Sequence, residues 1–132
     1  MGKRWDLSIN DKVDWREVRW HLNNRVAPVV VEVIKDFVSE RPAWEWWLLR
    51  VGDRLRQKPE DISLEVCFRL KTRSPIVSKK QLRSVTIMVA TLLLRLENVR
   101  ISCQHSLRRP PSELKFRITL DDFKQFRKRE RR

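Results

Sequence analysis

Three segments after residue 60 alternate between apolar and polar residues, and this alternation limits the fold more than any other feature. They run from Ile62 to Lys71, from Val99 to Gln104 and from Leu114 to Leu120. Successive side chains of a β-strand point to opposite faces of a sheet. Each segment is therefore predicted to be a strand with one buried face and one face in solvent.

A helix is predicted between the first and second of these strands. Ser78 and Gln81 match a capping box, and apolar residues then recur at helical spacing from Leu82 to Leu96. If the strands on either side of this helix are neighbours, they are parallel and joined by a right-handed crossover. The last two strands flank the loop 106–112 and are predicted to form an antiparallel hairpin.

The N-terminal part is rich in tryptophan, with all six indoles in the first 47 residues. Asp14 and Glu17 fit a capping box at the start of one helix, and a second helical pattern begins near Pro28, which could equally kink a longer helix. The β-branched run 29–33 leaves a strand open as an alternative. From residue 44 onward, apolar residues recur at i, i+3, i+4, i+7 and i+11, which predicts an amphipathic helix over 44–57.

Together these elements predict an α+β fold in a single domain over 1–132. A near-neutral, Trp-rich helical layer over 1–57 is followed by a strand-helix-strand-strand core over 58–123, with a three-stranded sheet. A short basic helix then leads into the tail 124–132. A chain of 132 residues is long enough to bury a core without disulfides or a structural metal.

The positive charge is concentrated in the C-terminal part of the chain. The formal net charge is +13, and Arg outnumbers Lys twenty to ten. Residues 1–56 carry 11 basic and 9 acidic side chains, whereas residues 57–132 carry 19 and 8. Such a balance is typical of proteins that bind polyanions, because each neutralised phosphate releases a condensed counterion. The bias toward Arg also fits phosphate binding, because the planar guanidinium group can donate two hydrogen bonds to one phosphate. Genomic base composition explains the bias equally well.

The strand alternation assigns many of these cations to the solvent face of the sheet. We predict a nucleic-acid-binding surface from the strands, the hairpin tip and the tail, made of Arg69, Lys71, Arg100, Lys115, Arg117, Arg108, Arg109, Lys124, Arg127, Lys128 and Arg129. Two alternatives remain. The face is only a charge-rich solvated surface, with Glu65 and Glu113 pairing across strands, or the N-terminal helices cover it.

No catalytic, cofactor or metal site is predicted. The chain has only two glycines, Gly2 and Gly52, so it lacks the loops that bind nucleotide phosphates. Its cysteine and histidine residues lack zinc-site spacing. The E-x-K tripeptide at 113–115 resembles a nuclease motif but is common by chance. The protein is therefore predicted not to be an enzyme.

Trp44, Trp46 and Trp47 cannot all share one face of a helix. The indoles either form the core of the N-terminal helical layer, or one of them, Trp46, is an exposed partner-binding residue. This residue supports an alternative function, an interaction or self-assembly module. In that module the Trp-rich helices bind a partner or a second copy, and the basic half docks an acidic protein.

The favoured function is non-enzymatic binding of RNA, slightly preferred over DNA, through the phosphate backbone. Readout by shape is expected because the predicted solvent face carries no aromatic residue at its strand positions. The longest apolar stretch spans about ten residues, too short to cross a membrane. With no signal peptide and only two cysteines, a cytoplasmic location is expected, or a nuclear one in a eukaryote. Peripheral binding to anionic membranes through the tail is a weaker third option.

Overall fold

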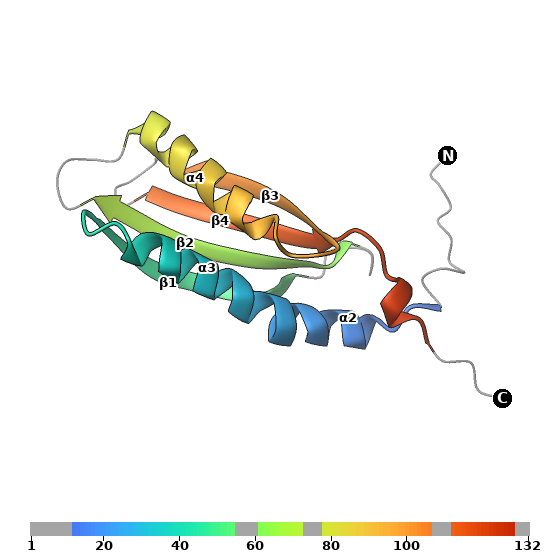
Figure 1. Cartoon of the computed structure of the whole chain (residues 1–132). Helices are drawn as coiled ribbons and strands as arrows, with labels where there is room; N and C mark the ends of the chain where they lie inside the picture. Colours follow the sequence, from blue (N-terminus) through green and yellow to red (C-terminus); the bar gives the residue numbers. More distant parts are fainter. Residues whose placement is uncertain (1–11, 55–60, 73–77, 107–111, 129–132) are drawn as a thin grey trace.

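The computed structural model describes residues 12–54, 61–72, 78–106 and 112–128. Within them, one antiparallel sheet of four strands has the spatial order β1-β2-β4-β3, and two helical elements cover one of its faces (Figure 1). The elements in chain order are α2 (Trp15–His21), η1 (Leu22–Val26), α3 (Ala27–Ser39), β1 (Trp44–Arg54), β2 (Ser63–Thr72), α4 (Lys79–Leu93), β3 (Val99–Ser106), β4 (Ser112–Leu120) and η3 (Lys124–Phe126).

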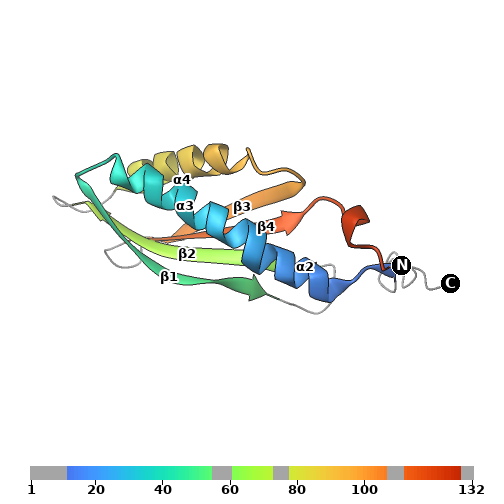
Figure 2. The same ribbon diagram turned by 60° about the horizontal axis from the view of Figure 1, so that its bottom comes forward.

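The segments α2, η1 and α3 follow one another without a break and form a single helical rod (Figure 2). Asp14 starts the rod, and its side chain accepts hydrogen bonds from the backbone N–H groups of Arg16 and Glu17. The middle segment is π-helical, and the Ala27 N–H bonds to the Leu22 carbonyl, five residues back. Pro28 follows directly and has no N–H to donate, so a widened turn before it relieves the clash of its ring. The run 29–33 is helical, and the strand alternative is wrong.

The helix predicted over 44–57 is wrong, because residues 44–54 form the edge strand β1. Trp46 and Leu48 pair with Leu70 and Phe68 of β2, so alternate residues of β1 face the helices. A bulge at Leu49 then shifts the alternation by one residue. The apolar positions 44, 48 and 51 match helical spacing only because the bulge shifts the alternation of the strand by one residue.

The predicted topology also needs correction. A mixed α+β class is broadly right, but the sheet has four strands rather than three. The strands on either side of α4 are not neighbours, because β2 pairs with β4, and every pairing is antiparallel. The condition for a parallel crossover, that these two strands are neighbours, is therefore not met. The short C-terminal helix is a single 3-10 turn over Lys124–Phe126.

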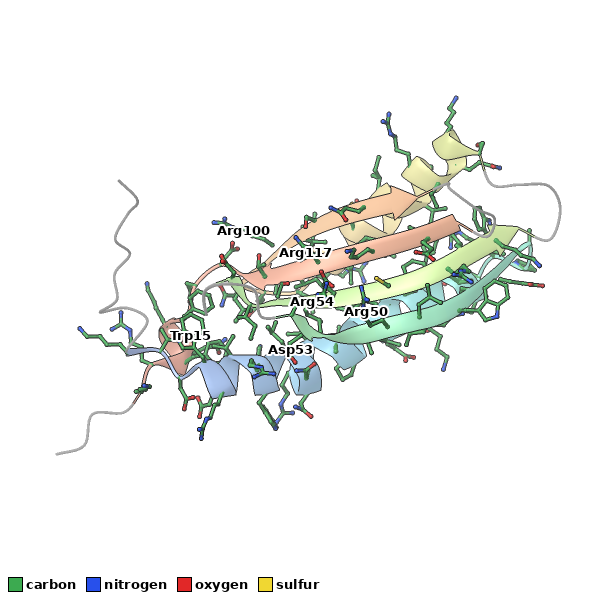
Figure 3. All side chains as sticks on the ribbon, turned by 180° about the vertical axis from the view of Figure 1, so that it is seen from behind. Trp15, Arg50, Asp53, Arg54, Arg100 and Arg117 are labelled. Atoms are coloured by element: carbon green, nitrogen blue, oxygen red, sulfur yellow. The ribbon has the colours of Figure 1, made fainter. Side chains whose placement is uncertain are left out.

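The hydrophobic core lies between the sheet and the helices α3 and α4. Phe68 of β2 and Phe116 of β4 stack at its centre, with ring centroids 5.9 Å apart. Buried leucine and isoleucine side chains of the helices belong to the same core cluster, among them Leu22, Ile34 and Leu82. The opposite face of the sheet has no described helix over it (Figure 3). The N-terminal helices therefore do not cover the face that was predicted to be cationic.

Asp53 fastens the edge strand β1 to the helical rod. Its carboxylate accepts hydrogen bonds from Arg19 Nε at 2.8 Å and from Asn23 Nδ2 at 2.6 Å. Burial alone raises the pKa of Asp53, but the hydrogen bonds from Asn23 and Arg19 and the charge of Arg19 outweigh it, so the pKa is lowered.

We expect Asp53→Ala to lower the free energy of unfolding by about 1 kcal/mol, since Arg19 is half exposed and regains water when its partner is lost. Urea unfolding followed by circular dichroism measures this change. The matched control is Glu45→Ala, which removes a more exposed carboxylate from the same strand. An equal loss in both variants would contradict the role of Asp53 as a fastening residue.

Candidate anion-binding face of the sheet

The face of the sheet away from the helices carries most of the strand cations. Pairing register places on this face the basic residues Arg50, Arg54, Arg69, Lys71, Arg100, Lys115 and Arg117, together with the acidic residues Glu45, Glu65 and Glu113. Figure 3 views the molecule from this side, with Arg50, Arg54, Arg100 and Arg117 labelled. We call it the open face.

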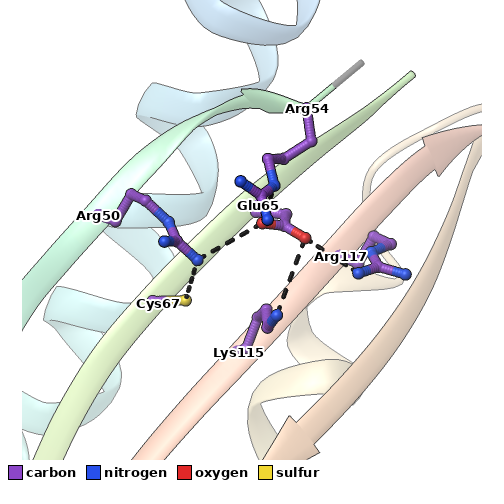
Figure 4. A network of polar contacts seen from close by, with 6 residues as sticks. All are labelled: Arg50, Arg54, Glu65, Cys67, Lys115 and Arg117. Carbon is purple, nitrogen blue, oxygen red and sulfur yellow. Dashed lines mark hydrogen bonds and ion pairs between the residues drawn. The ribbon is translucent and has the colours of Figure 1, made fainter. Parts of the chain in front are cut away.

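Glu65 of the interior strand β2 lies on the open face and is surrounded by four cations (Figure 4). Arg117 Nη2 donates to its Oε1 at 3.0 Å, and Lys115 Nζ lies 3.9 Å from the same oxygen. Arg54 Nε and Arg50 Nη2 lie 3.0 Å and 3.5 Å from Oε2. These five residues, two from β1, one from β2 and two from β4, form what we call the Glu65 cluster.

The Glu65 carboxylate is buried by the side chains that surround it, with 1% of the side chain exposed. Burial alone raises the pKa of a carboxyl, because it disfavours the charged form. The hydrogen bond from Arg117 and the charges of Lys115, Arg54 and Arg117 outweigh that effect, so the pKa of Glu65 lies below its ordinary value. Glu65 is therefore a stable anion at neutral pH and neutralises only one of its four cations.

The excess charge of the Glu65 cluster is accessible from solvent. The side chains of Arg50 and Arg54 are 52% and 53% exposed, and those of Lys115 and Arg117 are partly exposed. Arg50 Nη2 also contacts the Cys67 sulfur at 3.4 Å, which holds the guanidinium against the sheet. Three positive charges thus remain for an incoming anion, on side chains that a fixed carboxylate already orients.

The other strand cations of the open face are matched by local carboxylates. Arg69 pairs with Glu113 across β2 and β4 at 2.9 Å, and Lys71 Nζ lies 4.0 Å from Glu45. Arg100 pairs with Asp121, which follows β4. Arg69, Lys71, Arg100, Lys115 and Arg117 therefore share one face, as the alternation predicts, and the expected cross-strand pairing of Glu65 and Glu113 is present too. The unbalanced charge is concentrated around Glu65.

The remaining predicted binding residues lie away from this centre or outside the described residues. Lys124, Arg127 and Lys128 are exposed around η3, beyond the end of β4 and next to the start of α2. The Lys128 N–H bonds to the Lys12 carbonyl at 2.7 Å. Arg108, Arg109 and Arg129 are outside the described residues.

The prediction that Trp46 is an exposed residue of a helix is wrong. Trp46 lies on β1, faces the helices and is half-buried, with its ring edge-to-face with Phe68 at 6.4 Å. Its neighbour Trp47 is instead on the open face, 44% exposed, with Lys71 Nζ 5.8 Å from the ring centroid. The open face therefore does carry one aromatic side chain, at its β1 edge.

Sequence reasoning missed Arg50 and Arg54, which supply the most exposed charges of the Glu65 cluster. The helix predicted over 44–57 would carry both residues on its polar side, whereas in the structure they lie on a strand beside β2. No local signal in the sequence points to these two residues, because the alternation places Glu65 on the solvent face, where a carboxylate does not require cations on both neighbouring strands.

Comparison with known proteins finds no matching family model, curated protein or solved structure. Among the described residues, no three His, Cys, Asp or Glu side chains gather where a metal ion could be held. None of the helices in those parts of the chain has both the length and the apolar character to cross a membrane. Function is therefore inferred from the side chains themselves.

Proposed function

We propose that the protein is a non-enzymatic nucleic-acid-binding protein that holds the phosphate backbone of its ligand on the open face. The observation that carries this proposal is the Glu65 cluster, in which four cations surround one carboxylate on a sheet face that no described helix covers. The paired cations of the same face, Arg69 and Lys71 of β2 and Arg100 of β3, extend the basic surface beyond the cluster.

Phosphate suits this arrangement for two reasons. A guanidinium can donate two parallel hydrogen bonds to a phosphate, and charge-assisted bonds of this kind are stronger than neutral ones. Glu65 holds Arg54 and Arg117 in place before the ligand arrives, so less side-chain freedom is lost on binding. A sheet contributes broad, shallow contact, which favours recognition of backbone and shape over reading of base edges.

RNA remains slightly preferred over DNA as the ligand, and we place the protein in the cytoplasm, or in the nucleus of a eukaryote. An acidic protein partner is the alternative polyanion. It would present single carboxylates where a nucleic acid presents evenly spaced phosphates. Polyglutamate that displaced RNA at equal charge concentration would favour the acidic protein.

The decisive experiment measures affinity for a fluorescently labelled RNA and a DNA of the same sequence over a salt series. Binding through phosphates should weaken steeply between about 50 and 200 mM salt. We expect Arg50→Gln/Arg54→Gln to weaken binding about 10-fold at low salt and to reduce the slope of log K against log salt by about 2.

The matched control is Arg83→Gln/Arg95→Gln, which removes the same charge from α4 and the turn after it. Both control residues are exposed and belong to the helical side of the molecule. The control should bind almost as the unmodified protein does. Equal losses in both variants would mean that net charge, rather than the open face, determines binding, and the proposal would then be abandoned.

A further inference from the structure

The two edges of the sheet differ in chemistry. The β3 edge presents Arg100, Ser102 and Gln104 on the open face. The β1 edge instead carries a run of large apolar side chains, and Trp47, Leu48, Leu49 and Val51 are each between 40% and 44% exposed. No described strand pairs with the outer side of β1. Natural sheets usually protect a long edge with charges or prolines. The strand β1 has charged residues toward its two ends and at Arg50, but its middle exposes an apolar run, and this run indicates a partner.

The bulge at Leu49 makes this edge compatible with a second copy of itself. Before the bulge, even-numbered residues such as Leu48 face the helices, and after it odd-numbered residues such as Val51 do. Consider two β1 strands placed antiparallel about a two-fold axis between residues 49 and 50. Leu48 then stands opposite Val51 of the second copy, on the helix side of both chains. Strict alternation without the bulge would put such a pair on opposite faces.

Two of the residue pairs that this register brings together have side chains of complementary shape and polarity. On the helix side, two exposed apolar residues, Leu48 and Val51, meet. On the open face, Trp47 stands opposite Gly52 of the second copy, where an added Cβ would find no atom within 4 Å. An indole fills such a space, as aromatic residues do opposite glycines in natural sheets.

Charge also matches in this register. Glu45 and Arg54 both lie on the open face, and each stands opposite the other across the axis. Every pair occurs twice, because a two-fold axis makes an interface self-complementary. The two Arg50 side chains come near the axis, and each already lies beside its own Glu65.

We propose that the protein forms a two-fold symmetric dimer through antiparallel pairing of its β1 strands. The result is a continuous sheet of eight strands, with the helices of both copies on one side and the two open faces joined on the other. Residues 45–54 of each copy take part in the pairing. The dimer does not depend on the proposed nucleic-acid binding, although it would double the basic surface.

Sedimentation velocity tests the dimer on nuclease-treated protein in about 0.5 M NaCl, where bridging by nucleic acid is suppressed. We expect a dimer at about 100 µM protein. Leu49→Lys should convert it to a monomer, because the new charge would stand opposite Arg50 of the second copy. Leu49 has no partner residue in β2, so the change leaves the β1–β2 pairing intact.

Ile87→Lys is the control, since it makes the same kind of change at a 58% exposed residue of α4. It should remain a dimer. A monomeric unmodified protein overturns the proposal. Dissociation by Ile87→Lys and not by Leu49→Lys also overturns it, and would point to the apolar groove between α3 and α4, which Ile87 and Met88 help to line.

Disulfide cross-linking tests the register separately. With Cys67 and Cys103 replaced by serine, one preparation carries Leu48→Cys and another carries Val51→Cys. Residues directly opposite in an antiparallel pair have Cα atoms about 4.5–5.5 Å apart, which a disulfide can span. Mild oxidation should link the mixture and neither preparation alone. Efficient linking of the Leu48→Cys preparation by itself would contradict the proposed axis.

Discussion

Phe68→Ala is expected to lower the free energy of unfolding by about 4 kcal/mol, because it opens a cavity where the strands and helices meet. The Phe68 side chain is fully buried. Its ring stacks on Phe116 and meets the edge of Trp46, so it joins β1, β2 and β4 within the core. Such aromatic contacts add to the loss from burial alone.

Urea unfolding monitored by circular dichroism and tryptophan fluorescence measures this loss. Phe123→Ala is the matched control, since its ring contacts Trp15 at 4.9 Å but is only partly buried. We expect the control to lose about 1–2 kcal/mol. If Phe68→Ala fails to fold, Phe68→Leu should still show a loss of about 1 kcal/mol. Equal destabilisation by Phe68→Ala and Phe123→Ala would show that the core is not centred on Phe68.

The strands β2, β3 and β4 could be predicted from the sequence because each keeps a strict alternation along its length. Ile62 to Lys71 anticipates β2 almost residue for residue. The capping box at Ser78 also marks the start of α4 correctly, with both reciprocal hydrogen bonds formed. In each case a local pattern and the tertiary environment agree, which is when sequence reasoning succeeds.

The strand β1 could not be predicted in this way, because its bulge breaks the period of two. Leu49 is the extra residue of the bulge, and because of it the apolar positions on either side fall at helical spacing. Residue propensity alone does not decide between a helix and a strand here. Only pairing with β2, which buries Trp46 against Phe68, selects the strand.

The candidate site could be predicted from the sequence only in part. Alternation correctly places Arg69, Arg100 and Arg117 on one face. It does not show which cations share a carboxylate, since that depends on strand order. The spatial order β1-β2-β4-β3 sets Glu65 between Arg54 and Arg117, and no local signal specifies that order.

Glu65→Gln is expected to lower the free energy of unfolding by about 2–3 kcal/mol at neutral pH. Removing the buried carboxylate leaves the surrounding cations without a counter-charge, which destabilises the folded state. Arg50 and Arg54 are partly exposed to water, so the loss of stability is moderate. In the unmodified protein the folded state has the lower pKa, so the unfolded state takes up the proton first as pH falls below about 4.5. The stability from Glu65 is therefore present above that pH and is lost as pH falls through the folded-state pKa.

Urea unfolding at about pH 7 and about pH 4 should show a smaller difference for Glu65→Gln than for the unmodified protein. Glu113→Gln is the control, because its carboxylate is half exposed and pairs with Arg69 alone. We expect the control to change stability by less than about 1 kcal/mol. A pH dependence in Glu65→Gln equal to that of the unmodified protein would assign the acid sensitivity to other carboxylates.

The same substitution should act on nucleic-acid binding in the opposite direction. Neutralising Glu65 raises the excess positive charge of the Glu65 cluster from three to four, since all four cations remain. At a temperature where the variant is folded, RNA affinity at low salt is therefore expected to rise, with a steeper dependence on salt. A general loss of structure would lower stability and affinity together, so the opposite signs separate a charge effect from misfolding. Unchanged binding by the folded variant would mean that phosphates do not contact this cluster, whereas weaker binding would mean that Glu65 contributes more by orienting the arginines than it subtracts by its charge. Arg54→Gln distinguishes these two cases, because it should weaken binding only if the cluster is contacted.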